Sequence, residues 1–248
     1  MTNYRLVLCY DGAKYNGWQR LGDTDNTIQN RVETLLSRFL EQPVEVIASG
    51  RTDAGVHAMR QVCSFKAQTD LTTEELLQGI REHLPRDIGA ISLEVADPRF
   101  HARYNAVRKT YEYRVKTTCS PAVFERKYLF FFPHELNLNK MRLAAGMLCG
   151  EHDYSAFTSA KHMTKSAVRR VESIEIKDMG DGEIHLIFTG SGFLRNMVRI
   201  MTGTLLEVGT GRRDAWTIPE VLESRERAGA GFMAPPEGLF LMDVEYNS

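Results

Sequence analysis

The order of strand and helix patterns in the first hundred residues constrains the fold of this chain more than any other feature. Alternating apolar residues predict strands, and apolar residues at helical spacing predict helices. In chain order the pattern is strand, helix, strand, strand, helix and strand, over residues 3–10, 28–39, 44–49, 60–67, 71–84 and 87–95. This order is that of the ferredoxin-like β-α-β-β-α-β unit.

Helix-start signals support the two helices of this unit. Asn26 and Gln29 stand at capping-box spacing before the first helix, and Thr72 and Glu75 stand at the same spacing before the second. We therefore expect both helices to begin at a side-chain cap.

The second half of the chain repeats this order of elements with longer insertions, although no sequence repeat relates the halves. Strands are predicted at 109–116, 166–178, 182–190 and 237–246, and helices at 138–149, from Phe193 and after Ile218. The sequence thus predicts an α+β protein with two ferredoxin-like βαββαβ domains, over residues 1–104 and 105–248.

Composition narrows the class of protein. The chain has 248 residues, of which 43% are hydrophobic and 25% charged, the balance expected of a soluble globular protein. It shows neither a signal-peptide pattern nor a membrane-spanning stretch. Its four cysteines show no C-x-x-C spacing, which argues against a zinc site or a disulfide framework. We expect a cytoplasmic protein.

A charged turn, "SGRTDAGVHAMRQ" at 49–61, lies between two predicted strands. A turn that only reverses the chain needs no charged pair, yet this one carries Arg51 and Asp53, with His57 close by. Loops held by a rigid sheet are common places for functional side chains. An ionised, positioned carboxylate can act as a nucleophile, as a base or as a stabiliser of an oxocarbenium-like centre.

Arg199 interrupts an apolar run, Met197 to Met201, in the helix predicted from Phe193. Its guanidinium either extends to the surface or pairs with a carboxylate in the interior. If that carboxylate is Asp53, the opposite charge keeps the pKa of Asp53 below its ordinary value, so the side chain stays ionised at neutral pH. The pattern alone leaves both alternatives open.

A basic strip with interleaved aromatic residues covers residues 98–116, although the net charge of the chain is only −1. The basic residues are Arg99, Arg103, Arg108, Lys109, Arg114 and Lys116, and the aromatic ones are Phe100, Tyr104, Tyr111 and Tyr113. Basic side chains attract phosphates and aromatic faces stack on exposed bases. The strip is therefore either an RNA-binding surface or a solvated edge strand.

Two histidines invite a metal or acid–base interpretation that their surroundings do not support. His57 has no cluster of potential ligands, so a histidine bonded within its turn is favoured. His152 and Asp153, in "GEHDYSAF", show no metal-binding spacing, and we expect a helix end at Gly150 followed by a polar turn.

The turn Gly50–Ala58 resembles the signature of the tRNA pseudouridine synthase A (TruA) family. Further blocks that resemble the family follow in the expected order: "YDGAKYNGWQ" at 10–19, "FHARY" at 100–104, "KTYEY" at 109–113, "GEHDYSAF" at 150–157, "GSGFLRNMVRIMTGTLLEVG" at 190–209 and "APPEGLFL" at 234–241. Chance is an implausible account of seven collinear blocks.

The resemblance implies roles for particular residues. Asp53 would be the catalytic aspartate, Arg51 would help displace the target base, Tyr111 would stack on the flipped uracil, and Arg199 would pair with Asp53. Candidate substrate-binding residues besides Tyr111 are His57, Arg103 and Lys109. The basic residues of "KHMTKSAVRR" at 161–170 would hold phosphates together with the basic strip.

The resemblance also implies a pseudouridine-synthase-type fold with a central cleft, a homodimer that binds tRNA, and no metal or organic cofactor. The target would be uridines thirty-eight to forty of the tRNA anticodon arm. After Trp18 and Gln19, however, this chain has "RLGDTDNTIQ" where family members often have a short Gln-Pro-Asn-like turn. The alternatives are a member that modifies another position or RNA, a non-catalytic RNA-binding protein, or a hydrolase that uses Asp53.

Overall fold

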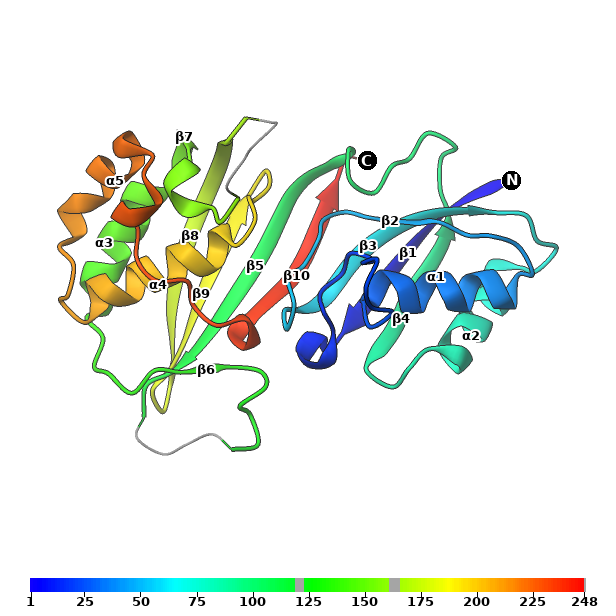
Figure 1. The fold of residues 1–248 in the computed structure, drawn as a ribbon, viewed down its shortest axis with the longest axis horizontal. Coiled ribbons are helices and arrows are strands. Elements are labelled where there is room, and N and C mark those ends of the chain that lie inside the picture. The colour runs from blue at the N-terminus through cyan, green and yellow to red at the C-terminus, as the bar shows by residue number, and fades with distance from the viewer. Residues whose placement is uncertain (119–122, 161–165, 248) are drawn as a thin grey trace. The chain divides into compact units, whose positions relative to one another are not determined.

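The computed structural model describes residues 1–118, 123–160 and 166–247 (Figure 1). The chain forms two compact units, the first made of Met1–Val107 and Phe240–Ser248 and the second of Arg108–Leu239. The predicted division lies three residues before the break at Val107, but the sequence placed the final strand in the second domain. Among the described residues, no helix is long and apolar enough to cross a membrane.

The first unit has the predicted β-α-β-β-α-β order. Its elements are β1 (Thr2–Tyr10), α1 (Ile28–Phe39), β2 (Val46–Ala48), β3 (His57–Ala67), α2 (Thr73–His83) and β4 (Ile88–Val95). Strand β1 is antiparallel to both β3 and β4, and β2 is antiparallel to β3. The α+β prediction and the ferredoxin-like order of this half are thus confirmed.

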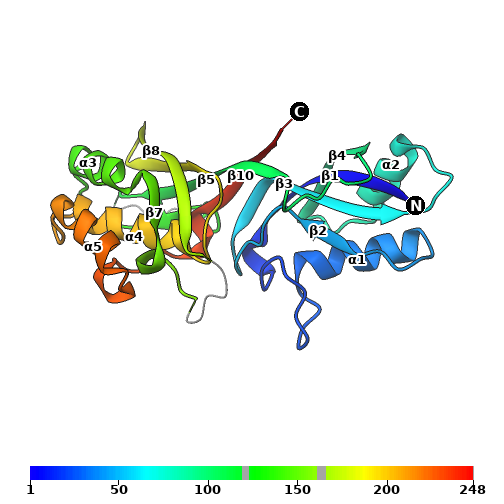
Figure 2. The same ribbon diagram turned by 90° about the horizontal axis from the view of Figure 1, so that it is seen from above.

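The last strand, β10 (Leu239–Tyr246), belongs largely to the first unit because it pairs with β3. The two strands lie side by side (Figure 2). The pairing is parallel, with Phe240 opposite His57 and Leu241 opposite Ala58. Strand β2 occupies the same edge of β3 only at Cys63–Phe65. The other end of that edge is therefore open to a strand that arrives from the far end of the chain.

The helices of the first unit bury one apolar side each, as amphipathic helices do when they pack on a sheet. Ile28, Leu36, Leu76 and Ile80 are fully buried with Leu6 and Leu8 of β1. Burying a side chain of this size contributes about 2 kcal/mol. The core thus ties α1 and α2 to β1, which pairs with the strand that follows the charged turn.

Of the two predicted helix caps, one is confirmed and one is wrong. Thr72 and Glu75 form the capping box of α2. The cap of α1 is Thr27, whose hydroxyl accepts a hydrogen bond from the Asn30 amide, because the side chain of Asn26 donates to the Lys14 carbonyl instead.

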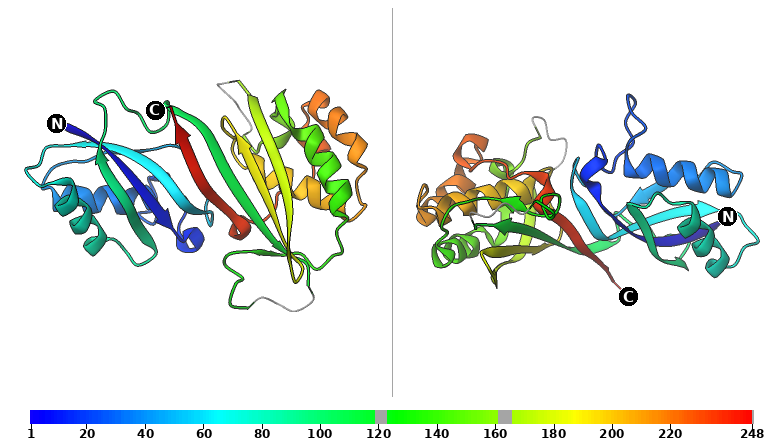
Figure 3. Two further views of the ribbon diagram at one scale, coloured as in Figure 1. Left: turned by 180° about the vertical axis from the view of Figure 1, so that it is seen from behind. Right: turned by 90° about the horizontal axis from the view of Figure 1, so that it is seen from below.

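The second unit, in its described residues, is a sheet with three α-helices. Its elements are β5 (Ala106–Lys116), β6 (Phe130–Phe131), α3 (Leu138–Leu148), β7 (Gly150–Asp153), β8 (Val168–Gly180), β9 (Glu183–Gly190), α4 (Met197–Gly209) and α5 (Ile218–Ser224). The strand order is β5-β9-β8-β7, and β6 pairs with the end of β5. Figure 3 shows the three helices gathered on one side of these strands.

Two predictions for the second unit are wrong in detail. The helix expected from Phe193 begins at Met197, because Asn196 before it has the left-handed φ of 59°. The polar turn expected after Gly150 is the short strand β7, which pairs with β8. The second departure depends on long-range strand pairing, which local sequence patterns do not encode.

Candidate functional site

The charged loop, residues 49–56, joins β2 to β3 in the first unit. Arg51 is exposed and Asp53 is partly exposed, whereas Thr52 between them is buried. Thr52 therefore anchors the loop to the core while its two charged neighbours stay accessible to a ligand.

A buried hydrogen-bond network lies beneath this loop. The Thr52 and Tyr10 hydroxyls are 2.8 Å apart, and the Gln61 amide nitrogen donates to the Tyr10 hydroxyl at 3.3 Å and to the Gly50 carbonyl at 2.9 Å. The Ser49 hydroxyl donates to the Gln61 amide oxygen at 2.6 Å. Buried polar groups that are fully bonded in this way fix one conformation.

The segment at residues 10–18 packs against the same loop through its backbone. The Trp18 amide donates to the Thr52 carbonyl at 3.0 Å, and the Gly55 amide donates to the Tyr15 carbonyl at 3.3 Å. Gly17 has a φ of 90°, and a Cβ at this position would lie 2.8 Å from the Thr52 carbonyl oxygen. The glycine of "YNGWQ" is thus required by the close approach of the charged loop.

His57 begins β3 directly after the loop and is 1% exposed. Its Nδ1 accepts a hydrogen bond from the Gly12 amide at 3.1 Å, and its ring stacks on Phe240 at 4.7 Å between centroids. The Asp11 carboxylate lies 3.3 Å from the same nitrogen. The Asp11 contact is an ion pair only when the imidazole is protonated.

Tyr111 and Lys109 lie on β5 in the second unit, where Tyr111 pairs with Phe188 of β9. The Tyr111 ring is 9% exposed and contacts Phe193 edge-on, with centroids 5.4 Å apart and planes at 85°. This contact holds the tyrosine ring in one orientation. Phe193 lies in the loop before α4, not in the helix where the sequence placed it.

Arg199 of α4 is 8% exposed, so its guanidinium does not extend into bulk solvent. Its Nε donates to the Ala234 carbonyl at 2.7 Å, and its Nη1 donates to the Asn196 side-chain oxygen at 2.9 Å. The sequence left two alternatives for this guanidinium, extension to the surface and pairing in the interior. The first is therefore wrong.

Tyr113 lies two residues after Tyr111 on the same face of β5. Its hydroxyl donates to the Pro235 carbonyl at 2.7 Å. Burial raises the pKa of Tyr113 well above its ordinary value, and the nearby charge of Arg199 only partly opposes this. Tyr113 is therefore a neutral hydrogen-bond donor.

Several residues of the basic strip form salt bridges in the described part of the chain. Arg108 binds Glu172 at 2.7 Å, Arg114 binds Glu112 at 2.7 Å and Lys116 binds Asp181 at 2.9 Å. The side chains of Arg99 and Arg103, in contrast, are exposed. Lys161 and Lys165, which the sequence assigned to phosphate binding, lie outside the described residues.

Sequence patterns assigned no separate role to Gln61, Tyr10 or Tyr113. Gln61 could have been noticed as a polar residue on the same face of the predicted strand as Cys63 and Phe65, which point inward. Within the described ranges, no group of three histidine, cysteine or acidic side chains is placed to hold a metal ion.

Comparison with known proteins connects this geometry to a family. A family model for tRNA pseudouridine synthase matches residues 7–105 and 144–247, which include the charged loop and α4. The chain is 42% identical over 246 residues to tRNA pseudouridine synthase A 2 of Bacillus cereus (strain ZK / E33L), covering 99% of this chain and all of the relative. It is 40% identical over 248 residues to tRNA pseudouridine synthase A of Listeria monocytogenes, again covering 99% and 100%. The chain therefore belongs to the tRNA pseudouridine synthase family.

Proposed function

We propose that this protein isomerises uridine to pseudouridine at positions thirty-eight to forty of the tRNA anticodon arm, with Asp53 as the catalytic carboxylate. The observation that carries the proposal is the charged loop, which presents a partly exposed Asp53 on a backbone fixed by buried hydrogen bonds. This loop lies inside the part of the chain that matches the family model.

The reaction conserves every atom of the nucleotide. The bond between ribose C1′ and uracil N1 breaks, the base turns, and C1′ bonds to C5, whose proton is then lost while N1 gains one. Attack of Asp53 on C1′ and removal of the C2′ proton both need an ionised carboxylate beside the sugar.

The target base must leave its stack before Asp53 can reach the sugar, at a cost of a few kcal/mol. We assign displacement of the base to Arg51, whose exposed side chain follows Gly50 in the charged loop. We assign stacking on the extruded uracil to Tyr111, which Phe193 holds edge-on. Arg103 and Lys109 are proposed as phosphate contacts. His57, the remaining substrate-binding candidate from the sequence, is buried, so we propose instead that it supports the loop from the core.

Arg199 is proposed as the cation that keeps Asp53 ionised. Its burial supports this assignment, because a buried guanidinium is stabilised by an anionic partner in addition to neutral acceptors. Its two neutral acceptors, Ala234 and Asn196, hold the group in a fixed orientation.

We further propose that the protein acts as a homodimer in the cytoplasm, in line with a tRNA substrate and with the family resemblance. Light scattering of the purified protein, with and without tRNA, measures its oligomeric state directly.

The test is pseudouridine mapping of tRNA incubated with the purified protein, combined with mass spectrometry. The proposal expects pseudouridine in the anticodon arm and no change in RNA mass. Release of free uracil would support a hydrolase, and binding without any conversion would support a non-catalytic RNA-binding protein. Conversion at another position would support the proposed isomerisation and contradict the proposed target positions.

A further inference from the structure

We propose that Gln61 is a positioning residue that holds the charged loop in the geometry Asp53 needs for catalysis. The inference rests on the proposed function of Asp53. Gln61 lies within β3, outside the loop, and its side chain is fully buried. It therefore acts on substrate only through the residues that it binds.

The amide of Gln61 has a single orientation that satisfies all of its contacts. Both amide hydrogens are used, one toward the Gly50 carbonyl and one toward the Tyr10 hydroxyl, while the amide oxygen accepts from Ser49. A flipped amide would place its oxygen against the Gly50 carbonyl oxygen, two acceptors without a proton between them. The Gly50 carbonyl thus fixes the orientation of the side chain.

These contacts hold the loop on both sides of Arg51. The direct bond fixes the Gly50 carbonyl, and the bond through Tyr10 reaches the hydroxyl of Thr52, the residue directly before Asp53. Losing the amide removes the bond to the Gly50 carbonyl and the donor that orients the Tyr10 hydroxyl toward Thr52. A displacement of about 1 Å at a reacting group can reduce the rate about 100-fold.

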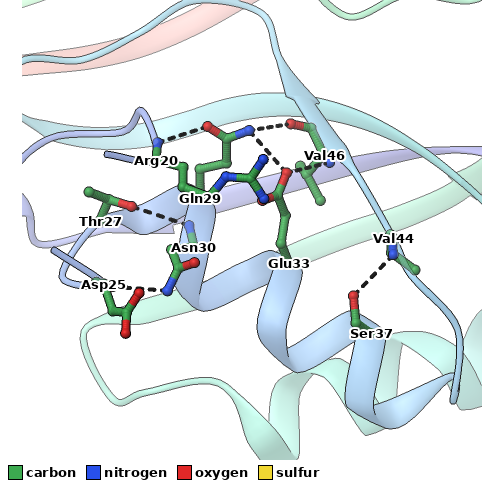
Figure 4. Close-up of polar contacts among 9 residues, drawn as sticks. All are labelled: Arg20, Asp25, Thr27, Gln29, Asn30, Glu33, Ser37, Val44 and Val46. Atoms are coloured by element: carbon green, nitrogen blue, oxygen red, sulfur yellow. Dashed lines mark hydrogen bonds and ion pairs between the residues drawn. The ribbon is translucent and has the colours of Figure 1, made fainter. Parts of the chain in front are cut away.

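Gln29 of α1 offers a matched control in the same unit. Its amide nitrogen donates to the Glu33 carboxylate and the Val46 carbonyl, and its amide oxygen accepts from the Arg20 amide (Figure 4). Like Gln61, Gln29 donates two side-chain hydrogen bonds and accepts one, although one of its acceptors is a carboxylate and its side chain is only half-buried. Its bonds tie α1 to β2 and to residue 20, however, and none reaches the charged loop.

The experiment compares Gln61→Met with Gln29→Met, because methionine keeps the length of glutamine and removes its amide. Both variants should lower Tm. We expect Gln61→Met to reduce kcat for pseudouridine formation about 10- to 100-fold with KM changed less than about threefold, and Gln29→Met to keep kcat within about twofold. All rates are measured well below the lowest Tm, so that partial unfolding does not enter.

Wild-type kcat in folded Gln61→Met would overturn the inference, as would an equal loss of kcat in both variants. If Gln61→Met does not fold, Tyr10→Phe decides, because it deletes only the hydroxyl between Gln61 and Thr52; we expect a three- to tenfold lower kcat, and an unchanged kcat would contradict the inference. Asp53→Asn is assayed in parallel. An active Asp53→Asn defeats the proposed function, whereas an inactive one beside a fully active Gln61→Met defeats only the role of Gln61.

Discussion

The two units of this protein hold their proposed catalytic groups in opposite ways. In the first unit, Arg51 and Asp53 project from a loop whose backbone is fixed from below by Tyr10, Thr52 and Gln61. In the second, Tyr111 and Arg199 are themselves buried, on a strand and a helix. In the proposed mechanism, the groups that approach the substrate are exposed on supported backbone, whereas the groups that orient the base and the charge are fixed by their own packing.

Replacing Arg199 tests the buried side of this comparison and should have the largest effect of any change outside Asp53. Arg199→Met leaves the Ala234 carbonyl without its donor and removes the proposed counter-charge of Asp53. We expect kcat to fall by at least about 100-fold and stability by about 1–3 kcal/mol. The acid limb of the kcat–pH profile should move to higher pH, because a carboxylate without its cation has a higher pKa.

Arg199→Lys keeps the charge and serves as the comparison. It should retain more activity than Arg199→Met and shift the acid limb less. Equal pH profiles for wild type and Arg199→Met would contradict the proposed pairing.

A larger residue at Gly17 tests how the charged loop of the first unit is supported. Gly17→Ala places a methyl group against the Thr52 carbonyl at a φ of 90°, and we expect a loss of about 2–4 kcal/mol in the free energy of unfolding. Gly22 is the control in the same segment, because a Cβ there meets nothing within 4 Å. Denaturant titration should separate the two alanine variants clearly; equal stabilities would show that the loop does not rest on Gly17.

Substitutions at Tyr111 test whether this buried ring stacks on the substrate base. Stacking of a base on an aromatic ring is worth about 1–3 kcal/mol, so Tyr111→Leu should lower kcat/KM about 5- to 150-fold. Tyr111→Phe retains the ring and should stay within about threefold of wild type. A Tyr111→Phe variant as poor as Tyr111→Leu would assign the role to the hydroxyl instead.

The smallest expected effect concerns stability alone. Hydrogen bonding to His185, followed by that to Arg114, lowers the pKa of Glu112 to about 2, and the Glu112 hydrogen bond raises the pKa of His185. Glu112 should stabilise the fold above about pH 4.5 and lose this contribution as pH falls toward 2. The contribution of His185 is complete below its unfolded pKa of about 6.5 and is lost as pH rises through the raised folded value.

Urea titrations between pH 2 and 8 measure this effect, which we expect to be on the order of 1 kcal/mol after solvent screening. Glu112→Gln should flatten both limbs without changing kcat at neutral pH. An identical pH dependence in wild type and Glu112→Gln would exclude the pair as its source.

Local signals in the sequence predicted the parts of the fold that local interactions determine. The element order of the first unit and the Thr72 cap follow from periodicity and capping chemistry. The strands β6 and β7 span only two and four residues, and their pairing with distant strands makes them visible only in three dimensions. The parallel pairing of β10 with β3 joins residues more than 180 positions apart, so no local pattern could assign β10 to the first unit.

The same limit applies to the candidate site. The charged loop stood out because a turn does not need Arg51 and Asp53. The burial of Arg199 was undecidable, since an arginine in an apolar helix face fits both alternatives. Gln61 was missed because its partners, Gly50 and Tyr10, are brought to it by the β1–β3 pairing and the return of the loop.

The conversion of uridine by an Asp53→Asn variant is the most direct test of the whole account. Asparagine keeps the size of the side chain and removes its charge, so we expect tRNA affinity within about threefold of wild type and pseudouridine formation reduced at least about 1,000-fold. Substantial conversion by this variant would contradict the account, because the chemistry would then not depend on a carboxylate at position 53.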